Sequence, residues 1–356
     1  MSNLHRILVA SYTNDVYTLE FDSSEATVTL KSSLEVGTHP SWLAPHPKDP
    51  SLVFTGLEQS DGKIVALKYD ENGVGKVVAH ASSGGEDPCH LLVKDDELLI
   101  ANYTSGDFSA LPISHEAPYF HSGTPKTIHL TGSGPNTERQ KTAHAHGVFW
   151  SEGTKELLVP NLGADRVSRL TRGSDGWKVA GDIKFHPGGG PRHVAIYDGM
   201  LYTILELTSH VYKHQLLPLP KEPVFLTAVS TLSHPPSGGA TAVGMLAAEI
   251  VIPETSSAYP TPYVYASNRN DPSPEGDTIV IFEASTSATL ALITEVRTGL
   301  KHLRGMVFGG PDDRWLIAGG ANGGGVRVYE RIDGGKGLKL VAQNEKVKAP
   351  TGFLWL

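Results

Sequence analysis

Arginine, histidine and glutamate side chains lie at the edges of short apolar segments throughout this 356-residue sequence. Arg192, Arg269 and Arg304 could each clamp a carboxylate or a phosphate, because the planar guanidinium donates two parallel hydrogen bonds. His146 and Glu206 could exchange protons with a reacting group. Cations beside an acid–base pair predict a site that acts on a small anionic substrate.

The elements that must position these residues are copies of one unit. A short apolar segment recurs at intervals of about fifty residues, which is the period of a four-stranded propeller blade. The seven copies are PSWLA at 40–44, PCHLLV at 88–93, HAHGVFW at 144–150, PRHVAI at 191–196, AAEIVI at 247–252, HLRGMVF at 302–308 and PTGFLW at 350–355.

Each copy is followed by a second apolar strand, then by an alternating third strand and an outer fourth strand. The last copy, PTGFLW, lacks a second strand, and RILVASY at 6–12 supplies one from the other end of the sequence. The sequence therefore predicts an all-β fold, a seven-bladed β-propeller with four antiparallel strands per blade, in which residues 1–356 form a single domain. N- and C-terminal strands that share one blade would close the ring and remove open sheet edges.

This topology brings polar residues to one face, because the start of each first strand lies beside the end of the antiparallel second strand. The first-strand positions hold Trp42, His90, His146, His193, Glu249, Arg304 and Gly352. The second-strand ends hold Tyr12, Glu58, Asn102, Tyr103, Asn161, Glu206, Asn268 and Arg269. The residues expected to contact the substrate are His90, Asn102, His144, His193, Glu249, Arg304 and Glu58. Such residues can also merely cap strand ends and bind water, but the mixture of cations and proton carriers favours a reactive site.

Two other features give weaker indications. Cys89 stands next to His90, and neighbouring residues on a strand point to opposite faces, so a small buried thiol is favoured over a nucleophile. Irregular stretches at about 112–142 and 217–246 are interpreted as loops that join strands within blades. They would either decorate the surface or form a rim over the pocket.

Composition limits the classes of partner. The formal net charge is −8 and no basic stripe is present, so neither nucleic acid nor an anionic membrane is expected as a partner. One cysteine allows no intrachain disulfide, the first residues lack the apolar length of a signal peptide, and no apolar run approaches the ~18 residues of a membrane span. We therefore expect a cytoplasmic protein.

Several motifs along the whole sequence resemble those of a known family. They are PCHL at 88–91, ANYTSG at 101–106, RQ at 139–140 with HAH at 144–146, NLGADRV at 161–167, GPRH at 190–193, AAEI at 247–250 and SNR at 267–269. The set resembles the lactonase family of seven-bladed propellers, which includes propeller-type 6-phosphogluconolactonase and the fungal 3-carboxy-cis,cis-muconate lactonizing enzyme. The resemblance implies that His146, Arg192, Glu206 and Arg269 are catalytic, because they match the His, two Arg and Glu proposed for the muconate enzyme.

Three functions are compatible with these residues. The first is hydrolysis of a small anionic lactone such as 6-phosphogluconolactone, in which Arg192 and Arg269 hold the anion and Glu206 or His146 activates water. The second is a 3-carboxy-cis,cis-muconate cycloisomerase, in which a carboxylate adds to a double bond and a general acid protonates carbon. The third is a non-catalytic propeller that binds a ligand or a protein, since fold alone does not fix function. The acid–base pair beside arginines favours the first two.

Exhaustive chelation should leave activity intact, because no metal or other cofactor is expected. His144, His146 and His193 could bind a metal, but no carboxylate at a matching spacing completes the ligand set. Activity after EDTA treatment and desalting measures this. Loss of activity that a divalent ion restores would contradict the prediction and make these three histidines ligand candidates.

Overall fold

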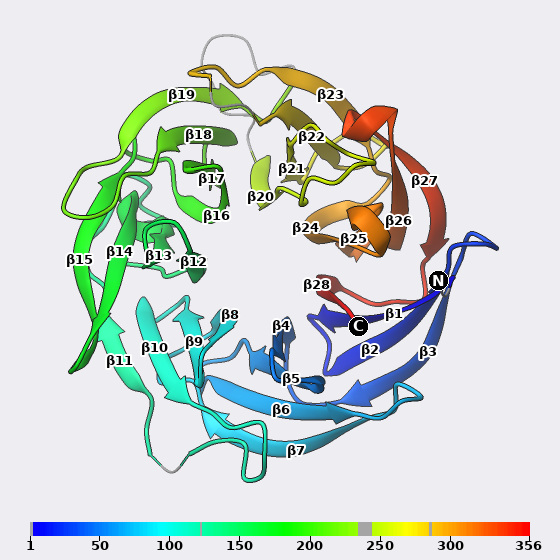
Figure 1. The fold of residues 1–356 in the computed structure, drawn as a ribbon, viewed down its shortest axis with the longest axis horizontal. Coiled ribbons are helices and arrows are strands. Elements are labelled where there is room, and N and C mark those ends of the chain that lie inside the picture. The colour runs from blue at the N-terminus through cyan, green and yellow to red at the C-terminus, as the bar shows by residue number, and fades with distance from the viewer. Residues whose placement is uncertain (1–2, 122, 234–243, 285–286) are drawn as a thin grey trace.

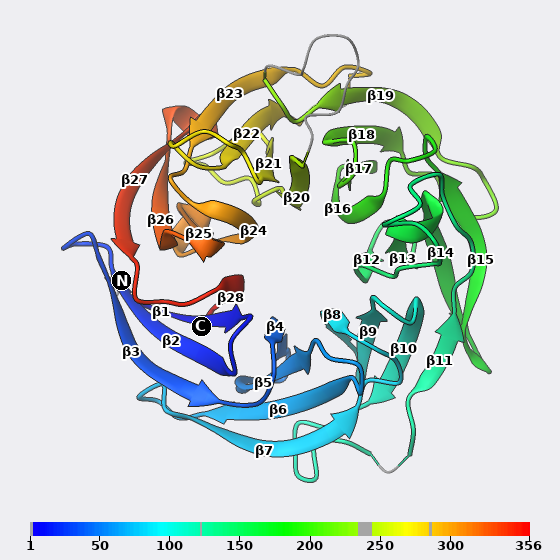
Figure 2. The same cartoon turned by 180° about the vertical axis from the view of Figure 1, so that it is seen from behind.

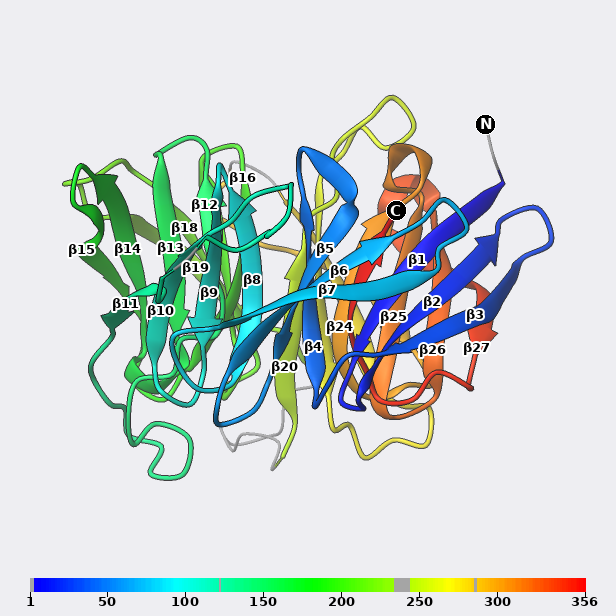
Figure 3. The ribbon, with the colours of Figure 1, turned by 90° about the horizontal axis from the view of Figure 1, so that it is seen from below.

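Seven four-stranded antiparallel sheets surround a central axis in the computed structural model, which describes residues 3–121, 123–233, 244–284 and 287–356 (Figure 1). The opposite face shows the same ring (Figure 2), and the edge-on view shows the blades standing side by side (Figure 3). The seven-bladed propeller predicted from the repeats is confirmed.

Strands take the same order from the axis outward in every blade. The innermost strands are β28 (Pro350–Trp355), β4 (Pro40–His46), β8 (Pro88–Lys94), β12 (Phe149–Ser151), β16 (Pro191–Tyr197), β20 (Leu246–Val251) and β24 (Lys301–Gly309). The second strands are β1 (Leu4–Ser11), β5 (Asp49–Leu57), β9 (Glu97–Asn102), β13 (Glu156–Asn161), β17 (Met200–Leu205), β21 (Tyr263–Arg269) and β25 (Trp315–Gly323).

The two outer layers complete each sheet. The third strands are β2 (Asp15–Asp22), β6 (Lys63–Tyr69), β10 (Asp107–Pro112), β14 (Arg166–Gly173), β18 (His210–Gln215), β22 (Thr278–Glu283) and β26 (Gly325–Ile332). The outermost strands are β3 (Thr27–Glu35), β7 (Gly75–Ser82), β11 (Lys126–His129), β15 (Gly176–Lys184), β19 (Val224–Ser230), β23 (Leu292–Arg297) and β27 (Gly337–Asn344).

Burial changes from the axis to the rim as packing requires. All six residues of β17 are buried, because neighbouring blades cover both faces of a second strand. In β3, exposed residues alternate with less exposed ones, as expected for a strand with one face in solvent. Among the described residues the helices are short 3₁₀ turns, η1 (Leu162–Ala164), η3 (Pro311–Asp313) and η4 (Asp333–Gly335), and none could span a bilayer.

The ring closes where β28 pairs with β1, seen as red beside blue in Figure 1. The antiparallel register sets Ile7 opposite Trp355 and Val9 opposite Phe353. Ile7 and Val9 are fully buried. The predicted closure of one blade by strands from both ends of the sequence is therefore confirmed.

Two details differ from the prediction. The first strand expected at 144–150 is shortened to β12, because the chain before it pairs with β13 through only an isolated bridge between Ala145 and Asn161. The stretches at 112–142 and 217–246 are not simple loops within blades. Each also contains an outer strand, β11 or β19, and part of the connection to the next blade. Residues 234–243 of the second stretch lie outside the described residues.

Deleting residues 1–12 should abolish cooperative folding, because β28 and β2 would both lose their partner strand. Burial of one large aliphatic side chain stabilises a fold by about 1.5–3 kcal/mol. Loss of Ile7, Leu8 and Val9, all fully buried, is therefore comparable with a typical net stability of about 5–15 kcal/mol. Thermal unfolding followed by circular dichroism measures the effect, with Leu356→Ala, at a 45% exposed position, as control. A truncated protein that melts cooperatively and is fully active would refute the closing role of β1.

Candidate active site

A recurring irregularity aims side chains toward the axis. At the start of several innermost strands the register with the second strand slips, as between Pro88 and His90 and between Pro191 and His193. Bulges of this kind redirect side chains and bend the strand. As a result Arg192 and His193 both reach the same polar cluster, although they are neighbours on one strand.

A cavity of about 280 Å³ lies where second strands end and first strands begin. Its lining is polar and consists of Tyr12, Glu58, Cys89, Tyr103, Arg139, His146, Glu206, Arg269 and Arg304. Tyr12, Glu58, Tyr103 and Glu206 each follow the last residue of a second strand, and Arg269 is the last residue of β21. The topology therefore brings these strand ends together, as the sequence predicted.

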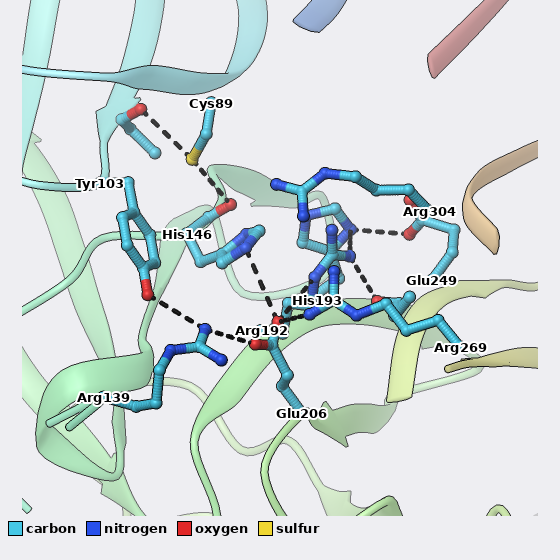
Figure 4. A network of polar contacts seen from close by, with 12 residues as sticks. Cys89, Tyr103, Arg139, His146, Arg192, His193, Glu206, Glu249, Arg269 and Arg304 are labelled. Atoms are coloured by element: carbon cyan, nitrogen blue, oxygen red, sulfur yellow. Dashed lines mark hydrogen bonds and ion pairs between the residues drawn. The ribbon is translucent and has the colours of Figure 1, made fainter. Parts of the chain in front are cut away.

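Glu206 is the centre of this cavity. Its side chain is 0% exposed, and its carboxylate forms ion pairs with three guanidiniums (Figure 4). Arg139 Nη2 lies 2.6 Å from Oε1, while Arg269 Nη2 and Arg192 Nε lie 2.7 and 3.2 Å from Oε2. Burial alone would raise the pKa of Glu206, but Arg269, Arg139 and Arg192 outweigh it and lower the pKa to about 2. The carboxylate is therefore ionised at neutral pH.

His146 faces the same carboxylate. Its Nε2 lies 4.0 Å from Glu206 Oε2, which is too long for a direct hydrogen bond and suits one bridging water. Burial, and then the charge of Arg192, lower the pKa of His146 well below its usual value. A neutral imidazole and an ionised carboxylate thus lie side by side, close enough for one water to hydrogen-bond to both.

A second ion pair forms another wall of the cavity. Arg304 Nη2 lies 3.8 Å from Glu58 Oε1, and its guanidinium stacks 4.9 Å from the centre of the Tyr12 ring. The Tyr12 hydroxyl donates a 3.1 Å hydrogen bond to Glu58 Oε1. Both Arg304 and Glu58, expected from the sequence to bind substrate, therefore lie on the cavity surface.

Other predicted residues lie behind the cavity. His193 Nδ1 and Glu249 Oε1 are 2.7 Å apart, and the His90 ring stacks on Trp42 with centroids 4.2 Å apart. Burial raises the pKa of Glu249 to about 7, against the opposing charge of Arg192. None of these side chains lines the cavity, and those of His90, His193 and Glu249 are buried.

Arg192 also lies deeper than the sequence suggested. Its Nη1 donates to the carbonyl oxygen of Ala248, and its Nε faces Glu206. It is 2% exposed and does not line the cavity. The structure therefore places Arg192 against Glu206 and behind the cavity lining, and its predicted grip on the substrate stays a prediction.

Asn102 and His144 also lie outside the cavity lining. The Asn102 amide donates to Ser109 Oγ at 3.1 Å, so it ties adjacent strands together and does not reach the cavity. His144 Nδ1 lies 2.9 Å from the Tyr103 carbonyl oxygen, and the two rings stack at 4.5 Å. His144 supports Tyr103 and lies outside the cavity lining. Within the described part of the chain, no three His, Cys, Asp or Glu side chains converge as a metal site would need.

Two lining residues were missed or misjudged from the sequence. Arg139 lies on the connection from β11 to β12, outside the repeated strands, and only its RQ motif marked it. Cys89 was expected to point away from the face that His90 uses, but the bulge brings it to the cavity wall. Its Sγ lies 3.5 Å from the His146 carbonyl oxygen, and burial raises its pKa, so the group stays a thiol.

Charge in the site opposes the charge of the whole chain. Of the described residues, the guanidiniums of Arg139, Arg192, Arg269 and Arg304 face the carboxylates of Glu58 and Glu206. The buried histidines are neutral because their pKa values are lowered. The site therefore carries excess positive charge in a chain of net charge −8.

Compared with the parent protein, the Glu249→Gln variant should gain stability between pH 5 and pH 8. The folded pKa of Glu249 is about 7 and its ordinary value is 4.5, so its stabilising contribution is complete below 4.5 and is lost as pH rises through 7. The difference in melting temperature, variant minus parent, should become more positive from pH 5 to pH 8. Exposed Glu345→Gln is the control, and an unchanged difference would contradict the raised pKa.

Comparisons with known proteins identify the family. A sequence model of the family described as "Lactonase, 7-bladed beta-propeller" matches residues 6–355. The 6-phosphogluconolactonase of Bacillus subtilis (strain 168) is 25% identical over 347 residues, which cover 94% of this chain and 92% of the relative. The 6-phosphogluconolactonase of Formosa agariphila is 27% identical over 343 residues, which cover 91% of each chain. A solved structure from Bacteroides fragilis NCTC 9343 shares the fold, with a TM-score of 0.85, 24% identity and coverage of 99% of this chain and 98% of its own. The chain therefore belongs to the lactonase family of seven-bladed β-propellers.

Proposed function

We propose that this protein hydrolyses a small anionic lactone of the 6-phosphogluconolactone type. The observation that carries the proposal is the pairing of a neutral His146 imidazole with the Glu206 carboxylate, 4.0 Å apart between Nε2 and Oε2, on the wall of a positively charged cavity. The curated relatives in Bacillus subtilis and Formosa agariphila, both named 6-phosphogluconolactonase, support the choice of substrate.

The first step uses a water held between His146 and Glu206. One of the two removes a proton as the water oxygen attacks the lactone carbonyl carbon. The carbonyl oxygen becomes an oxyanion, which the guanidinium of Arg269 or Arg304 can stabilise from the cavity wall. When the ring carbon–oxygen bond breaks, the proton returns to the leaving alkoxide and yields an open-chain hydroxy acid.

Positive charge would hold the substrate. Four guanidiniums beside two carboxylates carry a net positive charge, which would balance a doubly charged group such as a phosphate monoester. Low exposure strengthens the attraction between these charges and a bound anion, because the surrounding protein screens the interaction less than water does. Arg192 would act indirectly in this scheme, since it contacts Glu206 and lies outside the cavity lining.

The proton states favour hydrolysis over the muconate cycloisomerase. Lactone formation from a muconate needs a group that delivers a proton to carbon, whereas hydrolysis begins with proton removal. Lowered pKa values keep Glu206 and His146 in their basic forms at neutral pH. A purely structural propeller is disfavoured because buried charged groups are costly to retain without a use.

Replacing Glu206 with Gln should reduce turnover per folded molecule by roughly 100-fold or more, because the proton acceptor is lost. This variant should also melt at a lower temperature, since three guanidiniums lose their shared carboxylate. His146→Gln should lose comparable activity, because it removes the other proton acceptor. Its melting temperature should change little, because those ion pairs remain in place. The double variant should lose less than the product of both single losses if the two residues share one proton path.

Turnover is measured with 6-phosphogluconolactone and with 3-carboxymuconate, and a reaction without enzyme is the blank. The melting temperature is measured on the same protein samples. An active but destabilised Glu206→Gln protein would show that Glu206 is structural. Turnover of the muconate alone would reverse the choice between hydrolysis and cyclisation.

A further inference from the structure

We propose that Arg139 binds the distal anionic group of the substrate at the mouth of the cavity and so selects charged over neutral lactones. This inference rests on the proposed lactone hydrolysis and assigns the residue that reads substrate charge.

Exposure distinguishes Arg139 from the other arginines of the site. Its side chain is 35% exposed, compared with 17% for Arg304 and 3% for both Arg192 and Arg269. Figure 4 shows Arg139 approaching Glu206 from the side opposite Arg269. A ligand that enters from solvent therefore meets the Arg139 guanidinium before the deeper ones.

The guanidinium of Arg139 is only partly used. Both of its hydrogen bonds to described residues employ Nη2, which donates to Glu206 Oε1 at 2.6 Å and to the Tyr103 hydroxyl at 3.2 Å. Within the described part of the chain, Nε and Nη1 donate to no protein atom. These remaining donors can bind an oxyanion while the contact with Glu206 stays in place.

The backbone that carries Arg139 is firmly anchored. Asn136 Oδ1 accepts the Arg139 amide at 3.1 Å. The next residue, Gln140, is fully buried, and its Nε2 donates to Asp165 Oδ1 at 2.7 Å and to the Leu162 carbonyl oxygen at 2.9 Å. The side chain therefore presents its free donors from a fixed point, which reduces the entropic cost of binding.

An anion on Arg139 would also affect Glu206. Arg269 and Arg192 contact Glu206 Oε2 independently of Arg139, so the carboxylate remains paired if Arg139 turns toward a ligand. Arg139 is among the charges that lower the pKa of Glu206. Partial neutralisation of Arg139 by a bound anion would raise that pKa and make Glu206 a stronger base when the substrate is present.

The test compares Arg139→Gln with the parent on a phosphorylated δ-lactone and on its unphosphorylated counterpart. For the phosphorylated lactone, kcat/KM should fall by roughly 10- to 100-fold, mainly through KM, as expected for loss of a charge-assisted hydrogen bond. For the neutral lactone the fall should be at least tenfold smaller. Arg139→Lys should recover part of the preference, because it keeps the charge without the planar fork. Arg172→Gln, which removes an ion pair with Glu97 far from the cavity lining, is the matched control.

Equal losses on both lactones, or no loss on either, would overturn the role of Arg139. Binding of inorganic phosphate, followed by calorimetry, gives an independent measure that needs no turnover. It should weaken at least tenfold in Arg139→Gln and stay unchanged in Arg172→Gln. If the parent hydrolyses neither lactone, the proposed function fails, and the phosphate titration still decides whether Arg139 is an anion ligand.

Discussion

A buried carboxylate shared by three guanidiniums is the interaction on which the site depends. Arg139 comes from the connection between two blades, Arg192 from β16 and Arg269 from β21, and all three meet at Glu206. An unpaired charge in this position would cost several kcal/mol, so each member of the cluster requires the others. The cluster therefore ties two neighbouring blades to the connection between β11 and β12 at the cavity.

A buried layer behind this cluster supports it. The His193–Glu249 pair and the stack of His90 on Trp42 occupy the space next to Arg192. These groups need not touch a substrate to matter, because they limit where Arg192 and hence Glu206 can lie. A ring of ionisable residues seen in a propeller sequence is thus better divided into a surface that lines the cavity and a buried layer that packs behind it.

The repeated part of the architecture was readable from the sequence, and so were several residues of the site. Repeated strands can be aligned with one another in the sequence, so Glu58, Glu206 and Arg269 could be assigned to second-strand ends from the sequence alone. Features outside the repeat could not be placed in this way. Arg139 lies on an irregular connection, and its position depends on contacts of Gln140 with Asp165, distant in sequence.

Local register explains the remaining differences. The bulge near the start of β8 brings Cys89 to the cavity although strict alternation would turn it away. Asn102 occupies a predicted position, but a hydrogen bond to Ser109 directs its amide between strands. Such choices depend on which neighbour each group finds after folding, and the order of residue types does not encode them directly.

Pairing of β28 with β1 has a consequence for the order of events during synthesis. At roughly 5–20 residues per second, tens of seconds separate the emergence of β1 from that of β28. Throughout that interval one edge of β1, with its apolar Ile7 and Val9, has no native neighbour. The nascent chain must therefore carry an open, aggregation-prone sheet edge until residues 350–355 have been synthesised. Only then can β28 pair with β1 and close the propeller ring.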